Sequence, residues 1–261
     1  MEESLSPASI TDKLETRLIG QKIIYYPRLS STMDVAKRAA QQGATEGTVV
    51  IADEQTAGKG RIKRVWFSPR GSISLSVVLK PSVSYLPYLT MLASLAVVHS
   101  IETVAGLKPQ IKWPNDVLID GKKVCGILAE SEMRENAVAY AIIGIGINVN
   151  LGISGFPEIP STATSLADEL GNNVSRLDLI RCLLGEIDKL YLALPGSTGI
   201  LYEEWRDRLM TLDKKVRVQS GESTLEGIAE SVYRDGSLLL RHPDGSSTRI
   251  VAGDITLRDY Q

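Results

Sequence analysis

The feature that most constrains the fold is a change near Thr211–Asp213 from mixed helix and strand patterns to short strand patterns alone. Beyond it, five short patterns rich in β-branched and aliphatic residues cover residues 216–219, 223–233, 237–241, 248–251 and 255–258. Turn signals separate them at Ser220-Gly221, Asp235-Gly236 and Asp244-Gly245. Five short strands in so little chain predict a small β-barrel. We therefore expect two domains, residues 1–212 and residues 213–261.

Before that boundary, strand and helix patterns are mixed along the chain. Strand patterns cover residues 22–27, 48–52, 72–79, 110–112, 117–119, 123–131 and 138–147. Helical patterns cover residues 11–19, 33–42, 85–104, 175–194 and 199–210. Pro195-Gly196 is expected to end the fourth helix, because proline cannot donate the hydrogen bond that continues it. The first domain is thus expected to combine helices and strands around one core.

Charge and cysteine content exclude several classes of protein. Lysine and arginine number 29 against 31 acidic residues, so any polyanion-binding surface must be local. The two cysteines, Cys125 and Cys182, and the two histidines, His99 and His242, form no metal-ligand array, which argues against structural zinc. No signal-peptide pattern opens the sequence, and the most apolar stretch, Leu86–Val98, is too short to cross a bilayer. We expect a cytoplasmic protein with no membrane segment.

Residues 54–69 combine glycines with clustered cations. Gly58 and Gly60 allow close backbone approach to a ligand, and Trp66 offers a face for a base or another ring. The cations occupy four of six consecutive positions, namely Lys59, Arg61, Lys63 and Arg64. The pattern is neither a phosphate-binding P-loop nor a dinucleotide-binding glycine turn. It is compatible with an anion-binding flap or with a solvated basic loop.

Two further segments bring charge close to apolar strands. Lys112-Trp113-Pro114-Asn115-Asp116 sets a cation, an amide and a carboxylate around a rigid step, which suits a phosphate and its metal, or alternatively a plain turn. Lys123 enters an apolar strand that continues through Gly126. Partial burial of an ammonium is costly unless an anion accompanies it. Lys123 is therefore a candidate for binding an anionic ligand.

The strand over residues 138–147 carries two glycines at alternate positions, Gly144 and Gly146. Glycine weakens a strand, so the pair indicates that something packs closely on that face. A bound ligand and a neighbouring helix fit this pattern equally well. His99, on an apolar helix, is expected to be a packed residue and not a catalyst.

In their order and spacing, these four segments resemble the biotin protein ligase family, which joins biotin to one lysine of a carrier protein through biotinyl-5′-AMP. The resemblance extends from about Lys22 to Arg258. It implies an α+β fold in which a mixed β-sheet with flanking helices is followed by a small C-terminal SH3-like β-barrel. It also implies ATP and Mg²⁺ as co-substrate and ion, with biotin as the substrate.

The resemblance assigns roles to individual residues. Lys123 and Arg61 are the expected catalytic residues. The expected biotin contacts are Ser31, Thr32, Gln55, Gly58, Lys59, Arg61, Lys123 and Gly126. The expected ATP contacts are Arg64, Trp66, Lys112, Asn115, Asp116, Asn148 and Arg258. Asp116 is also expected near Mg²⁺.

The sequence departs from the family pattern at three positions. In the usual loop GRGRxGR, Lys59 replaces the first arginine and Lys63 the last glycine, so the bidentate fork and one flexible position are lost. Met33 stands where asparagine is common. The first expected strand begins at Lys22, which leaves too little chain before it for the DNA-binding domain of regulatory members. DNA binding is therefore not expected.

The expected partner is a biotin carboxyl carrier protein domain, and the family allows a homodimer. Two other functions fit some of the same features. One is a lipoate–protein ligase, which shares the body and the adenylate chemistry. The other is a non-catalytic module that binds biotin. The C-terminal strands and residues 112–116 favour biotin over lipoate, and the basic loop beside Lys123 favours catalysis over sensing.

Overall fold

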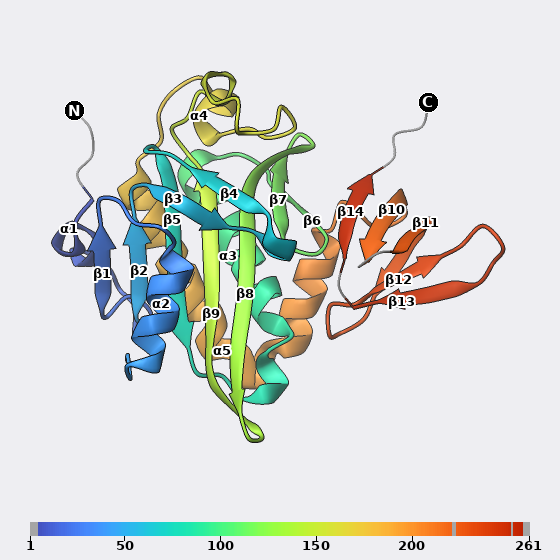
Figure 1. Ribbon diagram of the computed structural model, residues 1–261, viewed down its shortest axis with the longest axis horizontal. Coiled ribbons are helices and arrows are strands. Elements are labelled where there is room, and N and C mark those ends of the chain that lie inside the picture. The colour runs from blue at the N-terminus through green and yellow to red at the C-terminus, as the bar shows by residue number, and fades with distance from the viewer. Residues whose placement is uncertain (1–4, 221–222, 252, 258–261) are drawn as a thin grey trace.

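A computed structural model describes residues 5–220, 223–251 and 253–257 and is built around a seven-stranded mixed sheet (Figure 1). The strand order is β1, β2, β5, β9, β8, β7, β6. The first pair, β1 with β2, is parallel, and every later pair is antiparallel. The strands are β1 (Ile23–Tyr26), β2 (Val49–Ala52), β5 (Ser72–Leu79), β6 (Gln110–Lys112), β7 (Asp116–Ile119), β8 (Lys122–Arg134) and β9 (Ala137–Asn148).

Helices cover both faces of this sheet, as the resemblance implies. Helices α3 (Tyr88–Ala105) and α5 (Arg176–Asp207) pack together on one face, and α2 (Thr32–Gln41) lies on the other (Figure 1). The short helices α1 (Pro7–Thr11) and α4 (Leu166–Leu170) lie at the periphery. By length and composition α3 could cross a membrane, yet it is a core helix with most of its residues buried against the sheet and α5.

Strand β5 shows why the two faces differ. Ile73, Leu75 and Val77 alternate with serines and join the large apolar cluster beneath α3 and α5. Ser74 and Ser76 are buried on the opposite face, which α2 and residues 55–68 cover. Because side chains alternate along a strand, this pattern leaves one apolar face for the core and one polar face for a site.

Residues 55–68 form a hairpin that the sequence did not predict. Strands β3 (Gln55–Lys59) and β4 (Val65–Ser68) pair with each other in a separate two-stranded sheet. A 3-10 turn, Arg61–Lys63, forms the tip. We call residues 55–68 the flap, because Figure 1 shows them lying across β8 and β9.

Two helix predictions were wrong. The first helix spans Pro7–Thr11 instead of the predicted residues 11–19. The later part of the predicted range is irregular, because the Asp188 carboxylate accepts hydrogen bonds from the backbone N–H groups of residues 17–19. The helix α5 continues through Pro195 instead of ending there. Leu201 and Trp205 in its second half are buried in the core, so tertiary packing outweighs the hydrogen bond that proline removes.

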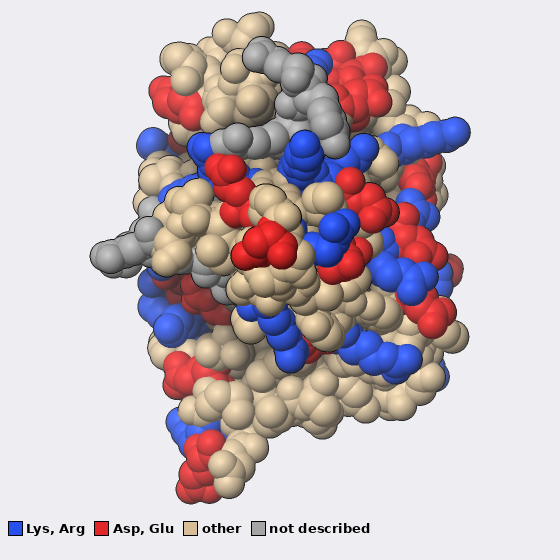
Figure 2. Space-filling model, turned by 90° about the vertical axis from the view of Figure 1, so that its right-hand side faces the viewer, with Lys and Arg blue, Asp and Glu red and all other residues tan. Residues whose placement is uncertain are grey.

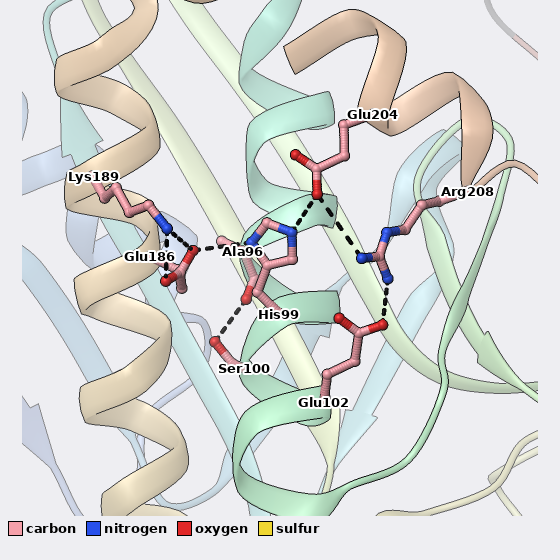
Figure 3. Close-up of polar contacts among 8 residues, drawn as sticks. All are labelled: Ala96, His99, Ser100, Glu102, Glu186, Lys189, Glu204 and Arg208. Carbon is pink, nitrogen blue, oxygen red and sulfur yellow. Dashed lines mark hydrogen bonds and ion pairs between the residues drawn. The ribbon is translucent and has the colours of Figure 1, made fainter. Parts of the chain in front are cut away.

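Polar contacts as well as apolar ones join α3 to both halves of α5 (Figure 3). The His99 ring nitrogens lie 2.9 Å from Glu186 Oε2 and 2.6 Å from Glu204 Oε1. Arg208 binds Glu102 of α3 and lies 3.9 Å from Glu204. His99 therefore joins α3 to both halves of α5 through two carboxylates. Both cysteines are free thiols; Cys125 is buried, and burial raises the pKa of its thiol.

The last part of the chain forms a five-stranded antiparallel sheet in the order β13, β12, β11, β10, β14. Its strands are β10 (Lys215–Ser220), β11 (Ser223–Val232), β12 (Leu238–Arg241), β13 (Ser247–Ile250) and β14 (Asp254–Leu257). This sheet is consistent with the expected SH3-like domain; its closure into a barrel stays a prediction. On the face that it presents in Figure 2, basic and acidic side chains are interleaved.

Hydrogen bonds fix this sheet to the body. Trp113 is buried, and its indole N–H donates to the Gly236 carbonyl at 2.7 Å. The Tyr202 hydroxyl of α5 donates to the Val232 carbonyl at 2.6 Å. The C-terminal sheet consequently lies against the end of the body that carries β6, β7 and the end of α5 (Figure 1).

Asp188→Ala should lower the free energy of unfolding by about 3 kcal/mol. The Asp188 carboxylate is 4% exposed and accepts hydrogen bonds of 2.8–3.0 Å from the backbone N–H groups of Arg17, Leu18 and Ile19, which the variant would leave without this partner. Urea denaturation measures the change. Asp207→Ala, on the same helix with a side chain 65% exposed, is the control and should shift stability by less than about 0.5 kcal/mol. Equal losses in the two variants would contradict the role given to Asp188.

Candidate active site

A cavity of about 380 Å³ lies between the flap, the polar face of β8 and β9, and residues 158–163. Most of the residues expected to bind ligands line it. These are Thr32, Gln55, Lys59, Arg61, Arg64, Trp66, Lys112, Asn115, Asp116, Lys123, Gly126 and Asn148. Arg61 and Lys123, which come from the flap and from β8, therefore share one cavity.

Lys123 is held at an irregular point of the sheet. A bulge in the β7–β8 pairing places Lys123 opposite Leu118 and Cys125 opposite Val117. On its other side, the Lys123 N–H donates to the Thr162 carbonyl at 2.9 Å, and its carbonyl accepts from the Thr164 N–H at 2.8 Å. The Lys123 backbone is therefore fixed by two neighbouring segments, which directs the side chain into the cavity.

The Lys123 ammonium has two partners there. Its Nζ lies 2.6 Å from Asp116 Oδ1 and 5.4 Å from the centroid of the Trp66 ring. A carboxylate and an aromatic face both stabilise a partly buried cation. Asp116 is the anionic partner that partial burial of Lys123 requires. A bound anion must therefore compete with Asp116 for the ammonium or share it.

Glycines form the floor of the cavity beneath Trp66. A Cβ at Gly146 would lie 2.3 Å from Trp66 Nε1, and one at Gly126 would lie 3.2 Å from the same ring. A Cβ at Gly144 would lie 2.6 Å from Met33 Sδ. Helix α2 packs on Gly144 through Met33, which is one of the two interpretations left open by the sequence. The flap packs on Gly146 through Trp66, which neither interpretation included.

Trp66 Nε1 is buried and has no hydrogen-bond partner among the residues that the structure describes. A buried N–H without a partner costs free energy unless a ligand or water accepts its hydrogen. The indole N–H is thus a candidate donor to a ligand or water beside the glycine floor.

Arg61 joins three parts of the chain. Its guanidinium donates to Asn115 Oδ1 at 3.0 Å and to the Gly253 carbonyl at 3.3 Å. Asn115 is fixed in turn, because its side-chain amide donates to the Ile127 carbonyl at 2.7 Å and its carbonyl accepts from the Ile127 N–H at 3.0 Å. Arg61 thereby closes the flap against both the body and the C-terminal sheet.

The polar residues at the start of α2 form a linked network. Gln55 Oε1 accepts from the Thr32 N–H at 2.8 Å and from the Thr32 hydroxyl at 3.1 Å, and Gln55 Nε2 donates to Ser74 at 3.1 Å. The Ser76 hydroxyl donates to Thr32 at 2.8 Å. Ser31 does not line the cavity; its hydroxyl is fully buried and has no partner within the described part of the chain.

The remaining residues that were expected to bind biotin or ATP lie in several different surroundings. Gly58 does not line the cavity, and a Cβ there would lie 2.3 Å from the Trp66 carbonyl, so its role is in the flap hairpin. Lys59 forms a half-exposed ion pair with Asp34. Asn148 is buried and donates to the Thr164 carbonyl at 3.0 Å. Arg258 lies outside the described residues.

Residues 158–163 were missed by the sequence analysis. Glu158, Thr162 and Ala163 line the cavity. The signal was the length of the connection between Asn148 of β9 and Leu166 of α4, because connections longer than about 12–15 residues are usually functional or disordered.

Comparisons with known proteins identify similar sequences and a similar fold. A family model described as the biotin/lipoate A/B protein ligase family matches residues 25–148. The bifunctional ligase/repressor BirA of Bacillus subtilis is 40% identical over 259 residues, covering 97% of this chain and 79% of that protein. A biotin–[acetyl-CoA-carboxylase] ligase of Mycobacterium tuberculosis is 33% identical over 234 residues, covering 87% of this chain and 85% of that protein.

A solved structure of biotin protein ligase from Aquifex aeolicus in complex with biotin and ATP has a TM-score of 0.74 to this chain. The two sequences are 28% identical, and the match covers 92% of this chain and all of that one.

Gly146→Ala should displace the Trp66 indole without unfolding the protein, because the clashing atoms belong to the end of a flexible side chain. Acrylamide quenching of tryptophan fluorescence should increase, since Trp113 and Trp205 are each 1% exposed and Trp66 is the accessible reporter. The free energy of unfolding should change by less than about 1 kcal/mol.

Gly196→Ala is the matched control, because a Cβ there meets nothing within 4 Å. Unchanged quenching in Gly146→Ala would contradict the packing of Trp66 on the glycine floor.

Proposed function

The chain belongs to the biotin/lipoate A/B protein ligase family, and from this premise we propose that it joins biotin to a lysine of a carrier protein through biotinyl-5′-AMP. The observation that carries the proposal is the cavity shared by Arg61 and Lys123. The first half-reaction brings together two anions, the biotin carboxylate and the α-phosphate of ATP. A site for it must neutralise their repulsion before they can react.

In the first half-reaction, a biotin carboxylate oxygen attacks the α-phosphorus, and the bond to pyrophosphate breaks. Lys123 orients the attacking carboxylate oxygen and an oxygen of the α-phosphate, and it stabilises the charge that develops on them. Asp116 holds the ammonium 2.6 Å away in the cavity, so Lys123 is already positioned when the substrates bind. Preorganised charge of this kind needs little rearrangement during the reaction.

In the second half-reaction, the neutral amine of the carrier lysine attacks the acyl carbon. A carbon–nitrogen bond forms, the carbon–oxygen bond to phosphate breaks, AMP leaves, and the amine loses a proton. Until the carrier arrives, water must be kept from the labile mixed anhydride. The flap serves as the lid, and its contacts from Arg61 to Asn115 and Gly253 close it.

The polar network at the start of α2 supports biotin over lipoate. Biotin carries a ureido ring with donors and an acceptor, whereas the lipoate ring is apolar. Gln55 offers an amide on the cavity wall, and Ser31, which lies next to Thr32 but outside that wall, has a buried hydroxyl that lacks a partner among the described residues. Buried polar groups left unpaired by the wrong acid penalise it strongly, so this chemistry selects the ureido ring.

ATP would lie toward the cationic and amide side chains of the cavity. We assign its binding to Arg64, Lys112 and Asn148, with Trp66 as an aromatic wall. Arg258 stays a proposal from the sequence alone. Mg²⁺ would enter with the phosphates, because it is usually held by one or two carboxylates and by substrate oxygens. Asp116 and Glu158 are carboxylates on the cavity wall that fit this role.

The carrier is proposed to be a biotin carboxyl carrier domain, by analogy with the acetyl-CoA carboxylase named for the mycobacterial relative. Residues 1–212 would provide the catalytic domain and residues 213–261 the SH3-like domain. A cytoplasmic location fits the free thiols of Cys125 and Cys182. A homodimer also stays a prediction.

The test of the proposal is ATP-dependent transfer to a purified carrier domain, read by intact mass. The carrier should gain the mass of one biotinyl group when ATP and biotin are both present, and nothing when either is omitted. Transfer of lipoate with equal efficiency would make the protein a lipoate ligase. Biotin binding without transfer would make it a sensor.

Lys123→Ala should lower biotinyl-AMP formation by about two to three orders of magnitude, the scale expected when a preorganised charge is removed. Biotin-dependent exchange of pyrophosphate into ATP measures this step. Lys122→Ala is the control, because the neighbouring lysine is half-exposed and reaches Glu169 at 3.6 Å. Near-normal exchange by Lys123→Ala would remove Lys123 from the mechanism.

Arg61→Gly should open the flap and release biotinyl-AMP before transfer. The free adenylate should then acylate exposed lysines of a bystander protein such as serum albumin, which a streptavidin blot detects. Arg28→Gly serves as the control, because Arg28 is an exposed arginine paired with Glu54 at 3.0 Å. Labelling that stays confined to the carrier would mean that Arg61 does not retain the adenylate.

A further inference from the structure

A buried ion pair lies outside the cavity, at the point where β2 runs into the flap. Arg176, the first residue of α5, is 7% exposed, and its Nη1 donates to Asp53 Oδ1 at 3.2 Å. The same nitrogen donates to the Ser72 carbonyl at 3.2 Å. Such a pair offsets the cost of burying a guanidinium. Neither Arg176 nor Asp53 lines the cavity, so any effect that they have on a ligand is indirect.

The ion pair closes the base of the flap. The ladder between β2 and β5 ends with Ala52 opposite Ser74. Beyond this pair the two strands separate, because one continues into the flap and the other returns from it. Asp53 directly follows Ala52, and Ser72 is the first residue of β5. Arg176 therefore bridges the two strands just beyond their last paired residues.

The bridge lies next to a hydrogen bond of the cavity wall. Gln55 follows Asp53 by two residues, and Ser74 follows Ser72 by two residues. Gln55 Nε2 donates to the Ser74 hydroxyl at 3.1 Å. The separation of the two strands at this point decides whether the Gln55 side chain reaches Ser74. Since Arg176 fixes that separation, it also fixes where the Gln55 amide lies.

Strand β1 completes the support of Asp53. The Tyr25 hydroxyl donates to Asp53 Oδ2 at 2.6 Å, and the Asp53 N–H donates to the Tyr26 carbonyl at 3.2 Å. Burial and the hydrogen bond to Asp53 raise the pKa of Tyr25 to about 12, so this hydroxyl remains a donor at neutral pH. Both carboxylate oxygens of Asp53 are thus engaged, one by β1 and one by α5.

We propose that Arg176 is a positioning residue for biotin recognition, which holds Gln55 in place at the cavity wall by tying Asp53 to the first residue of β5. The inference deepens the proposed ligase function and rests on it. The ureido ring of biotin has N–H donors and a carbonyl acceptor, so it needs polar partners at fixed positions. A displacement of about 1 Å is enough to lose much of such an interaction.

Arg176→Met removes both hydrogen bonds and keeps an apolar stem. In biotin-dependent pyrophosphate exchange, the KM for biotin should rise about tenfold, the effect of losing one hydrogen bond in recognition. The KM for ATP and kcat should stay within about twofold of wild type. A purely structural role would instead reduce the fraction of folded enzyme, which lowers the apparent kcat and leaves both KM values unchanged.

Combined variants test the route through Gln55. Gln55→Ala should raise the KM for biotin about tenfold or more, and adding Arg176→Met to Gln55→Ala should raise it by less than about twofold further. An unchanged KM for biotin in either single variant overturns the inference. Multiplicative effects of the two substitutions overturn it as well, because Arg176 would then not act through Gln55.

Arg181→Met is the matched control. Arg181 lies on the same helix with a side chain 18% exposed, and it donates to the carbonyls of Ser9 at 2.5 Å and Ile10 at 3.5 Å, away from the flap. Its KM for biotin should stay within about twofold of wild type. If Arg176→Met does not fold, the double variant with Asp53→Asn, which also removes the unpaired carboxylate, is judged by the same criteria. A wild-type protein without biotin-dependent exchange would instead mean that the proposed function has failed.

Discussion

The ion pair between Lys123 and Asp116 is the interaction on which the candidate site depends, because it neutralises an ammonium beside Trp66 in a cavity that Lys59, Arg61, Arg64 and Lys112 also line. An unpaired ammonium in such surroundings would be costly. Asp116 offsets this cost while no substrate is bound. An anionic substrate can then take over part of the interaction, so the same pair both stabilises the empty site and prepares it for chemistry.

The glycine floor and the flap together keep Trp66 beside the Lys123 ammonium. Gly126 and Gly146 let Trp66 lie close enough to β8 and β9 to face Lys123, and Met33 fills the space over Gly144. Arg61 then links the flap to the body and to the C-terminal sheet. Through this bond to Gly253, the C-terminal part of the chain helps hold the flap over the site.

The sequence predicted the parts of this arrangement that depend on local pattern. Alternation over residues 72–79 correctly indicated a buried strand, and the strand glycines correctly indicated close packing on one face. The partial burial of Lys123 correctly indicated an anionic partner, which is Asp116. Local pattern failed where distant contacts decide. Asp188 shapes the segment after Thr11, and buried Leu201 and Trp205 keep α5 helical beyond Pro195. The pairing of Lys123 with Thr162 and Thr164 joins segments that are far apart in the chain, and no periodicity reveals it.

The most direct test of the shared site is a crystal structure of the protein with a non-hydrolysable analogue of biotinyl-5′-AMP. The account predicts that Lys123 Nζ lies within about 3.2 Å of an oxygen at the junction of acyl group and phosphate. It also predicts that the Arg61 flap closes over the ligand and that the ring system rests on the glycine floor. An analogue bound elsewhere, or bound with Lys123 still turned to Asp116 and away from the ligand, would contradict it.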